Sequence, residues 1–345
     1  MPKYWLISDR NNGGTGTGRN VQGLTYWVSD GGPLNNISNW RKVTPTQFRT
    51  LLSAAAEAFP ALPQGENEKQ SHVTILVHGF NVSFDSSTGF YESVCGKLFD
   101  GADSLGLCIL YDWPSLGTVV GYEPDRAQAR ACADDLTNIL SELFDWLIRK
   151  QQDAIRSGGN PEKACKAKVS VIAHSMGNYL LQKAMAAAWT RKNQPLLVTL
   201  INQLLMVAAD VDNNLFDAGA PDNDDGAAMA NLTYRITALY SGRDAVLGAS
   251  AGLKHFGTRR LGRSGLATRP PLVTAPPQTD NVWDVDCSDF FPAAVDSQAV
   301  HGACFNTDAT IDLMRQILRG IDRGVLEKSG ATGVKATVAS GSPGT

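Results

Sequence analysis

The chain has 345 residues, of which 43% are hydrophobic, and it carries a formal net charge of −3 at pH 7. This length suits one large α/β domain or two small ones, and the charge gives no reason to expect nucleic acid or an anionic membrane as a partner. No apolar run reaches the ~18 residues of a membrane-spanning helix, and the first residues lack the apolar stretch of a signal peptide.

Strand and helix patterns follow one another from the N-terminus. Short strands are predicted at 3–9 and 24–29. The glycine-rich segment 11–20 between them lacks the spacing of a phosphate-binding loop, and no helical pattern follows it, so we interpret it as a mobile loop. A helix is predicted at 46–59, where Pro60 ends it, and a polar linker comes next.

Beyond this linker, apolar strand patterns alternate with amphipathic helix patterns. The predicted strands are 72–77, 107–111, 169–173, 204–208, 234–240 and 282–285, and the predicted helices are one ending near Asp100, 125–150, 179–189 and 311–326. Continuous apolar strands that alternate with helices indicate a mostly parallel sheet covered on both faces, the α/β class. Residues 329–345 are small and polar and predict a disordered tail.

The cysteines argue for a reducing environment. There are six of them, too few for a disulfide scaffold, and none forms a C-x-x-C pair. They therefore favour free thiols in a cytoplasmic protein over a zinc site or a redox motif. A bridge between Cys287 and Cys304 stays open on the sequence alone.

One strand end carries a serine in a distinctive setting. The strand at 169–173 is followed at once by Ser175 and then by a helical run. This is the layout of a nucleophile elbow, a tight strand-to-helix turn that exposes a serine hydroxyl and needs small neighbours such as Ala173 and Gly177. The usual pattern has glycine where Ala173 stands. The alternative is a serine that caps a buried helix.

A serine nucleophile needs a histidine base within hydrogen-bond reach. Of the five histidines, His72 begins a strand and so lies at the wrong end of the sheet. His78 and His174 stand in turns that direct their side chains elsewhere. His301 follows the last predicted strand, where a loop can carry it over the sheet to Ser175. We therefore expect His301 to be the base, and His255, which precedes that strand, is the less favoured candidate.

The base in turn needs an orienting carboxylate. In sheets of this kind the chain order is nucleophile, acid, base. Asp244 satisfies this order and follows a strand directly, in the turn Ser241-Gly-Arg-Asp244. Asp210 and Asp212 follow the preceding strand and are the alternative candidates for the acid. If they are not the acid, we expect them to cap a helix or to form a turn.

An oxyanion needs two backbone N–H groups, and we expect them from Met176, directly after the serine, and from Phe80, in the loop after the strand at 72–77. Gly79 lets this loop approach a substrate closely. Because ligands bind beyond the carboxyl ends of parallel strands, the same edge supplies the candidates for a substrate pocket. These are His78, Gly79, Asn81, Trp113, His174 and Asp210.

With these pieces assembled, the chain resembles the α/β-hydrolases, and most closely the bacterial α/β-hydrolase family of unknown function within the esterase/lipase superfamily. The resemblance covers about residues 65–325. The matching stretches are Leu76–Phe84, Asp112–Gly117 with Tyr122 and Asp125, Ala173–Asn178, Ala208–Asp212, Tyr240–Leu247, Arg260–Gly262, Val285–Ser288 and His301. Where family members commonly have glycine before the histidine, this chain has Val300.

The resemblance implies an α/β-hydrolase fold with a possible small cap. We expect one domain over 1–328, with N-terminal strands and a helix in 1–64 and the catalytic core in 65–328. Residues 213–231 are the candidate for this cap or lid, and the sequence leaves open whether they form one. The basic segment Lys254–Arg269 could attract an anionic substrate, and a structural or solvated role is favoured for it.

The resemblance also implies a serine hydrolase in which Ser175 is the nucleophile, Asp244 the acid and His301 the base. We expect carboxylic esters as substrates, an acyl-enzyme intermediate, and neither a metal nor a cofactor. The alternatives are thioester or amide hydrolysis, acyl transfer, and a non-catalytic interaction protein that keeps the fold. The oligomeric state stays open.

Overall fold

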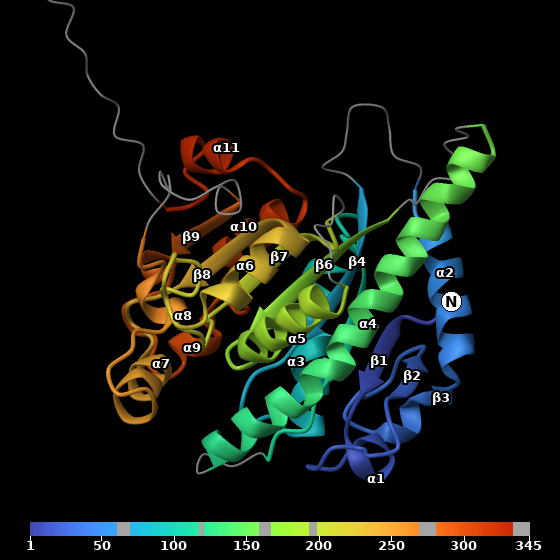
Figure 1. The fold of residues 1–345 in the computed structure, drawn as a ribbon, viewed down its shortest axis with the longest axis horizontal. Helices are drawn as coiled ribbons and strands as arrows, with labels where there is room; N and C mark the ends of the chain where they lie inside the picture. The colour runs from blue at the N-terminus through green and yellow to red at the C-terminus, as the bar shows by residue number, and fades with distance from the viewer. Residues whose placement is uncertain (61–69, 117–120, 159–166, 193–198, 269–280, 334–345) are drawn as a thin grey trace, which may run out of the picture.

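The computed structural model describes residues 1–60, 70–116, 121–158, 167–192, 199–268 and 281–333. Within these residues, nine strands form one sheet in the order β3-β2-β1-β5-β4-β6-β7-β8-β9 (Figure 1). The strands are β1 Tyr4–Ser8, β2 Thr25–Ser29, β3 Arg41–Val43, β4 Ser71–Val77, β5 Gly106–Asp112, β6 Ala167–His174, β7 Ile201–Val207, β8 Thr233–Tyr240 and β9 Val282–Asp286.

The sheet is mostly parallel. The pairs from β1 through β9 along the sheet run parallel, whereas β2 pairs antiparallel with both β1 and β3 at one edge. The central strands β4, β6 and β7 are buried over nearly their whole length, which is the physical reason that they appear as continuous apolar runs in the sequence. The predicted α/β class is confirmed.

Helices cover both faces of the sheet. On one face lie α2 (Pro45–Glu57), α4 (Tyr122–Arg156), α5 (Gly177–Lys192) and α6 (Asn223–Leu232), which share one apolar core. Figure 1 shows α4, the long green helix, running across this face beside α5. On the other face, a second core contains residues of α3 (Phe84–Leu98), α10 (Asp308–Leu318) and α11 (Arg323–Lys328).

Short helical turns lie mainly in the loops at the sheet ends. They are α1 Asn11–Gly14, η1 Ile37–Asn39, α7 Ala245–Ala249, η5 Ser250–Lys254, α8 Leu261–Ser264, η7 Ser288–Phe290 and α9 Val300–Ala303. None of the helices in the described ranges combines the length and the apolar character that crossing a bilayer requires.

Two expectations about the chain need correction, and one question that the sequence left open is answered. The helix predicted at 311–326 is two helices, α10 and α11, because Gly320 between them adopts a left-handed φ of +80° that ends the first one. The tail does not begin at 329, since residues 329–333 form a turn with Thr332 buried; residues 334–345 lie outside the described ranges. The thiols of Cys287 and Cys304 are free rather than bridged.

Candidate active site

The turn from β6 to α5 holds Ser175 in an unusual backbone conformation. Its φ is +53°, a left-handed value that is unfavourable for a residue with a Cβ. Several hydrogen bonds hold it there: the Ser175 N–H donates to the Val207 carbonyl at 3.0 Å, and the Ser175 carbonyl accepts from the Asp210 N–H at 3.2 Å. The Asn178 side chain also bridges the turn, donating to the Ala173 carbonyl at 2.9 Å.

Two glycines are required by close packing around this turn. A Cβ on Gly79 would lie 2.7 Å from the Cβ of Ser175, and a Cβ on Gly177 would lie 2.5 Å from the carbonyl oxygen of His78. Both distances are shorter than real Cβ contacts allow. The turn therefore needs small residues, and the fully buried Ala173 fits where the usual pattern has glycine.

Ser175, His301 and Asp244 form a continuous chain of contacts. His301 Nε2 lies 2.9 Å from Ser175 Oγ, and His301 Nδ1 lies 2.8 Å from Asp244 Oδ2. With Nδ1–H donating to the carboxylate, the neutral ring leaves Nε2 free to accept from the serine hydroxyl. The buried Asp244 is itself fixed, because its Oδ1 accepts from the Leu247 N–H at 2.9 Å as the cap of α7.

The turn on α9 that carries His301 rests on His174. The Nε2 of His174 lies 3.0 Å from the His301 carbonyl oxygen, and its ring packs against Phe90 and Phe305. Burial, followed by the nearby His301, lowers the pKa of His174 to about 3. The ring is therefore neutral and donates from Nε2. The His174 ring lies 4.9 Å from the His301 ring, centroid to centroid, and it does not line the cavity at Ser175.

Two backbone amides near the serine have no acceptor. Within the described ranges, the N–H groups of Phe80 and Met176 make no hydrogen bond. Each belongs to a segment that touches Ser175: Met176 follows it in the chain, and Phe80 follows Gly79, which packs against it.

A cavity of about 540 Å³ opens at Ser175 and His301. Its apolar wall consists of Phe80 and side chains of α7, and its polar lining comes from several separate segments. The polar residues beyond Ser175 and His301 are Asn81, Tyr122, Asp210, Ser250 and Gln298. Of the six residues expected in the pocket, Asn81 and Asp210 line this cavity, and Gly79 contacts the serine.

The remaining three are His174, described above, and His78 and Trp113, which also do not line the cavity. The rings of His78 and Trp113 stack on each other with centroids 5.2 Å apart, and the Trp113 Nε1–H donates to the His78 carbonyl at 2.9 Å. They support the loop that leads to Phe80 from behind. Position at a strand end therefore does not distinguish residues that line the cavity from residues that support the loop beside it.

Asp210 is fully engaged beside the cavity. Its carboxylate accepts from Arg260 Nε at 2.8 Å, from the Tyr122 hydroxyl at 2.8 Å and from the Ser250 hydroxyl at 2.9 Å. Burial alone would raise the pKa of Asp210, but Arg260 and the two hydroxyls outweigh it and hold that pKa below its ordinary value. Asp244, and not Asp210, is the carboxylate that contacts His301.

The sequence did not single out Tyr122, Ser250 and Gln298 as lining residues, because none directly follows a strand. The less favoured base, His255, does not line the cavity and contacts Tyr122, whereas His301 contacts Ser175. The Nε2 of His255 is 2.6 Å from the Tyr122 hydroxyl, and burial followed by Arg260 lowers the pKa of His255.

Residues 213–231, the candidate cap or lid, do not line the cavity at Ser175. Their C-terminal part enters α6, which packs on α5 and contributes the buried Met229 to the core. The basic segment Lys254–Arg269 has a structural component, since Arg260 is fully buried between Asp210 and Asp212. No cluster of three or more potential metal ligands occurs among the described residues.

The fold and this site define an α/β-hydrolase. Residues 61–290 match the family described as alpha/beta hydrolase of unknown function, DUF900, and because this match covers more than half of the chain, the chain belongs to that family. No curated protein matches the chain.

Solved structures with a similar fold include hydrolases from fungi and bacteria. The putative cell surface hydrolase from Lactobacillus plantarum WCFS1 is 9% identical with a TM-score of 0.37, over 76% of this chain and 97% of that one. Carboxyl esterase 2 from Tuber melanosporum is 12% identical with a TM-score of 0.34, over 73% and 78%. Aspergillus fumigatus lipase B is 13% identical with a TM-score of 0.27 over 52% of this chain, which spans only 40% of that lipase. At these values the likenesses say nothing about substrate.

Proposed function

We propose that the protein is a serine hydrolase that cleaves carboxylic esters through an acyl-enzyme intermediate. The observation that carries this proposal is the unbroken series of contacts from Ser175 through His301 to Asp244 at the mouth of a cavity. The left-handed backbone at Ser175 supports it, because strain of this kind persists where the surrounding structure holds a residue for function.

In the first half of the reaction, His301 Nε2 takes the proton of Ser175, and Oγ attacks the ester carbonyl carbon. The carbonyl π electrons move to oxygen, and the N–H groups of Phe80 and Met176 stabilise this oxyanion. When the intermediate collapses, the bond to the alcohol oxygen breaks and His301 gives that oxygen the proton. Asp244 stabilises the imidazolium that forms in between.

In the second half, a water molecule gives a proton to His301 and attacks the acyl carbon. Collapse releases the carboxylic acid and returns the proton to Ser175 Oγ. The apolar wall formed by Phe80 and α7 suits the hydrocarbon part of such a substrate, because its burial releases water from both surfaces.

The decisive test removes the Ser175 hydroxyl. Ser175→Ala should lower kcat on p-nitrophenyl esters by at least a thousandfold, since the nucleophile of a triad is indispensable to the covalent route. The variant should fold as the wild type, because alanine is smaller and keeps the Cβ. Retained turnover would rule out the proposed nucleophile.

A second measurement separates ester hydrolysis from related acyl chemistry. A fluorophosphonate should label the wild type at Ser175 and leave Ser175→Ala unlabelled. A panel of esters, thioesters and amides with matched acyl groups then ranks the reaction classes by kcat/KM. Absence of labelling in the wild type would favour a non-catalytic protein with this fold.

A further inference from the structure

The loop from His78 to Val82 presents the Phe80 amide, and side chains from distant segments hold it at both ends. At its first residue, Trp113 donates to the His78 carbonyl at 2.9 Å, while His78 Nε2 lies 3.0 Å from Asp112 Oδ1. Between the ends, Asn81 adopts a left-handed φ of +59°. A loop with a strained residue keeps its shape only if its ends are fixed.

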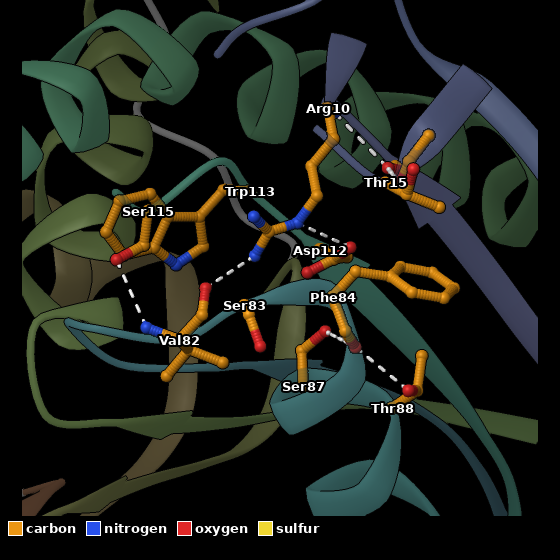
Figure 2. Close-up of polar contacts among 12 residues, drawn as sticks. Arg10, Thr15, Val82, Ser83, Phe84, Ser87, Thr88, Asp112, Trp113 and Ser115 are labelled. Atoms are coloured by element: carbon orange, nitrogen blue, oxygen red, sulfur yellow. Dashed lines mark hydrogen bonds and ion pairs between the residues drawn. The ribbon is translucent and has the colours of Figure 1, made fainter. Parts of the chain in front are cut away.

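At the other end of the loop, side chains bind both backbone groups of Val82. The Val82 N–H donates to Ser115 Oγ at 3.2 Å, and the Val82 carbonyl accepts from Arg10 Nη2 at 2.8 Å. Figure 2 shows the two contacts meeting at Val82 from opposite directions. Ser115 is held in turn by the carboxylate of Asp125 at the start of α4.

Arg10 is a completely buried cation. Its side chain is 0% exposed, as is that of Asp112, whose Oδ2 accepts from Arg10 Nε at 2.8 Å. Burial alone would raise the pKa of Asp112, but Arg10 and then His78 outweigh it and hold that pKa below its ordinary value. The guanidinium thus joins the strand-end carboxylate to the loop carbonyl through two rigidly related nitrogens.

A buried ion pair is a weak source of stability, because the cost of removing both charges from water offsets much of their attraction. Such a pair does, however, fix the relative positions of the two side chains and of the groups that they contact. Here the fixed geometry extends from Asp112, through the guanidinium, to the backbone two residues beyond Phe80.

We propose that Arg10 is a positioning residue that holds the Phe80 amide in register with Ser175, an inference that rests on the proposed hydrolase function. Arg10 follows β1 and lies outside the residues 61–290 that match the family. The N-terminal segment thereby contributes directly to the geometry of the active site, in addition to extending the sheet at one edge.

The proposed role predicts a loss in kcat with little change in KM. An amide that stabilises the oxyanion acts mainly on the transition state, and a displacement of about 1 Å lowers the rate by roughly a hundredfold. We expect most ground-state contacts of the substrate to be with the α7 side chains that line the cavity, and Arg10 contacts none of these.

The test compares Arg10→Met, Arg10→Lys and Arg19→Met, each checked for folding by circular dichroism and thermal unfolding. Arg19 is the matched control, because it lies in the same loop and pairs with Asp9 and Asp135 but not with the residues 78–82. We expect Arg10→Met to lower both kcat on a p-nitrophenyl ester and the rate of fluorophosphonate labelling by about ten- to a hundredfold, with KM within threefold. Arg10→Lys should restore part of the loss, and Arg19→Met should stay within twofold of the wild type.

A folded Arg10→Met variant with wild-type kcat would overturn the proposal. If that variant does not fold, Arg10→Met/Asp112→Asn removes both buried charges, and wild-type kcat in this folded double variant would equally overturn the proposal. If the fluorophosphonate labels the wild type at Ser175 and labels Arg10→Met at the same rate, the role proposed for Arg10 is wrong and the proposed hydrolase function stands. Absence of labelling in the wild type defeats the proposed hydrolase and this role together.

Discussion

Around Ser175 the chain is packed so closely that a single added carbon atom at some positions would collide with its neighbours. Gly79 is the clearest case, since an added Cβ would lie 2.7 Å from Ser175 Cβ and 3.3 Å from Ser175 Oγ. Neither the serine turn nor the loop that carries Gly79 can move easily to make room for this atom. The serine is held by hydrogen bonds to Val207 and Asp210, and the loop is held at His78 and Val82.

We therefore predict that Gly79→Ala lowers kcat/KM on esters by about a hundredfold or more, because the loop and the serine must separate. Gly89→Ala is the matched control: Gly89 lies on the exposed side of α3 with open space around it, and alanine there should raise stability by up to about 1 kcal/mol. Initial rates and chemical denaturation of both variants provide the measurement. Full activity in Gly79→Ala would show that the close approach has no functional consequence.

The contacts of Ser175, Asp244 and His301 were foreseeable because local sequence places each of them, directly after a strand or in the loop beyond the last one. The partners that orient the site were not. Arg10 and Tyr122 reach the site through contacts between segments about a hundred residues apart, and no local pattern encodes such distances.

At the scale of elements, the apolar wall that Phe80 and α7 form continues along the chain into η5, whose Ser250 also lines the cavity. The wall begins at Asp244, which caps α7, and continues into a π-helical turn over Ser250–Lys254, a geometry that recurs at functional sites. The hydroxyl of Tyr122 anchors its far end, because it contacts Asp210, Ser250 and His255. The position of this wall thus depends on the first turn of α4.

Tyr122→Phe should loosen this wall. We expect KM for esters to rise severalfold with a smaller change in kcat, if the wall binds the hydrocarbon part of the substrate as proposed and does not contact the reacting atoms. We also expect the free energy of unfolding to fall by about 1–3 kcal/mol, because a buried oxygen of Asp210 loses its donor. Tyr234→Phe, at an exposed position of β8, is the control for loss of a tyrosine hydroxyl. An unchanged KM in Tyr122→Phe would argue against the wall as a substrate contact.

At the scale of the whole molecule, the strand patterns predicted the class of the fold but not the order of its strands. The first predicted strand, now β1, inserts beside β5 and pairs with it in parallel, although about a hundred residues separate them. The three-residue β3 was not predicted at all, since only Val43 of it is buried and it lacks an apolar pattern. Strand order reflects which faces and edges pack best, a property of the assembled chain.

Burial of titratable groups makes the stability of the whole molecule depend on pH. Burial lowers the pKa of His72 to about 3, and that of His174 likewise, against an ordinary value of 6.5. The unfolded chain therefore binds protons below pH 6.5 that the native protein does not, so the stabilising contribution is complete above pH 6.5 and is lost as the pH falls toward 3. Asp9 acts in the opposite direction, because burial raises its pKa to about 6.

We predict that the free energy of unfolding, measured by urea denaturation, is lower at pH 5 than at pH 7. His72 is buried between strands with its Nδ1 2.7 Å from Ser170 Oγ, and it alone should account for about 2 kcal/mol of the difference. His72→Gln should therefore show a smaller difference between the two pH values, whatever its own stability at pH 7, because glutamine does not titrate. An equal pH dependence in the wild type and in His72→Gln would mean that this histidine binds its proton as readily in the native protein as in the unfolded chain.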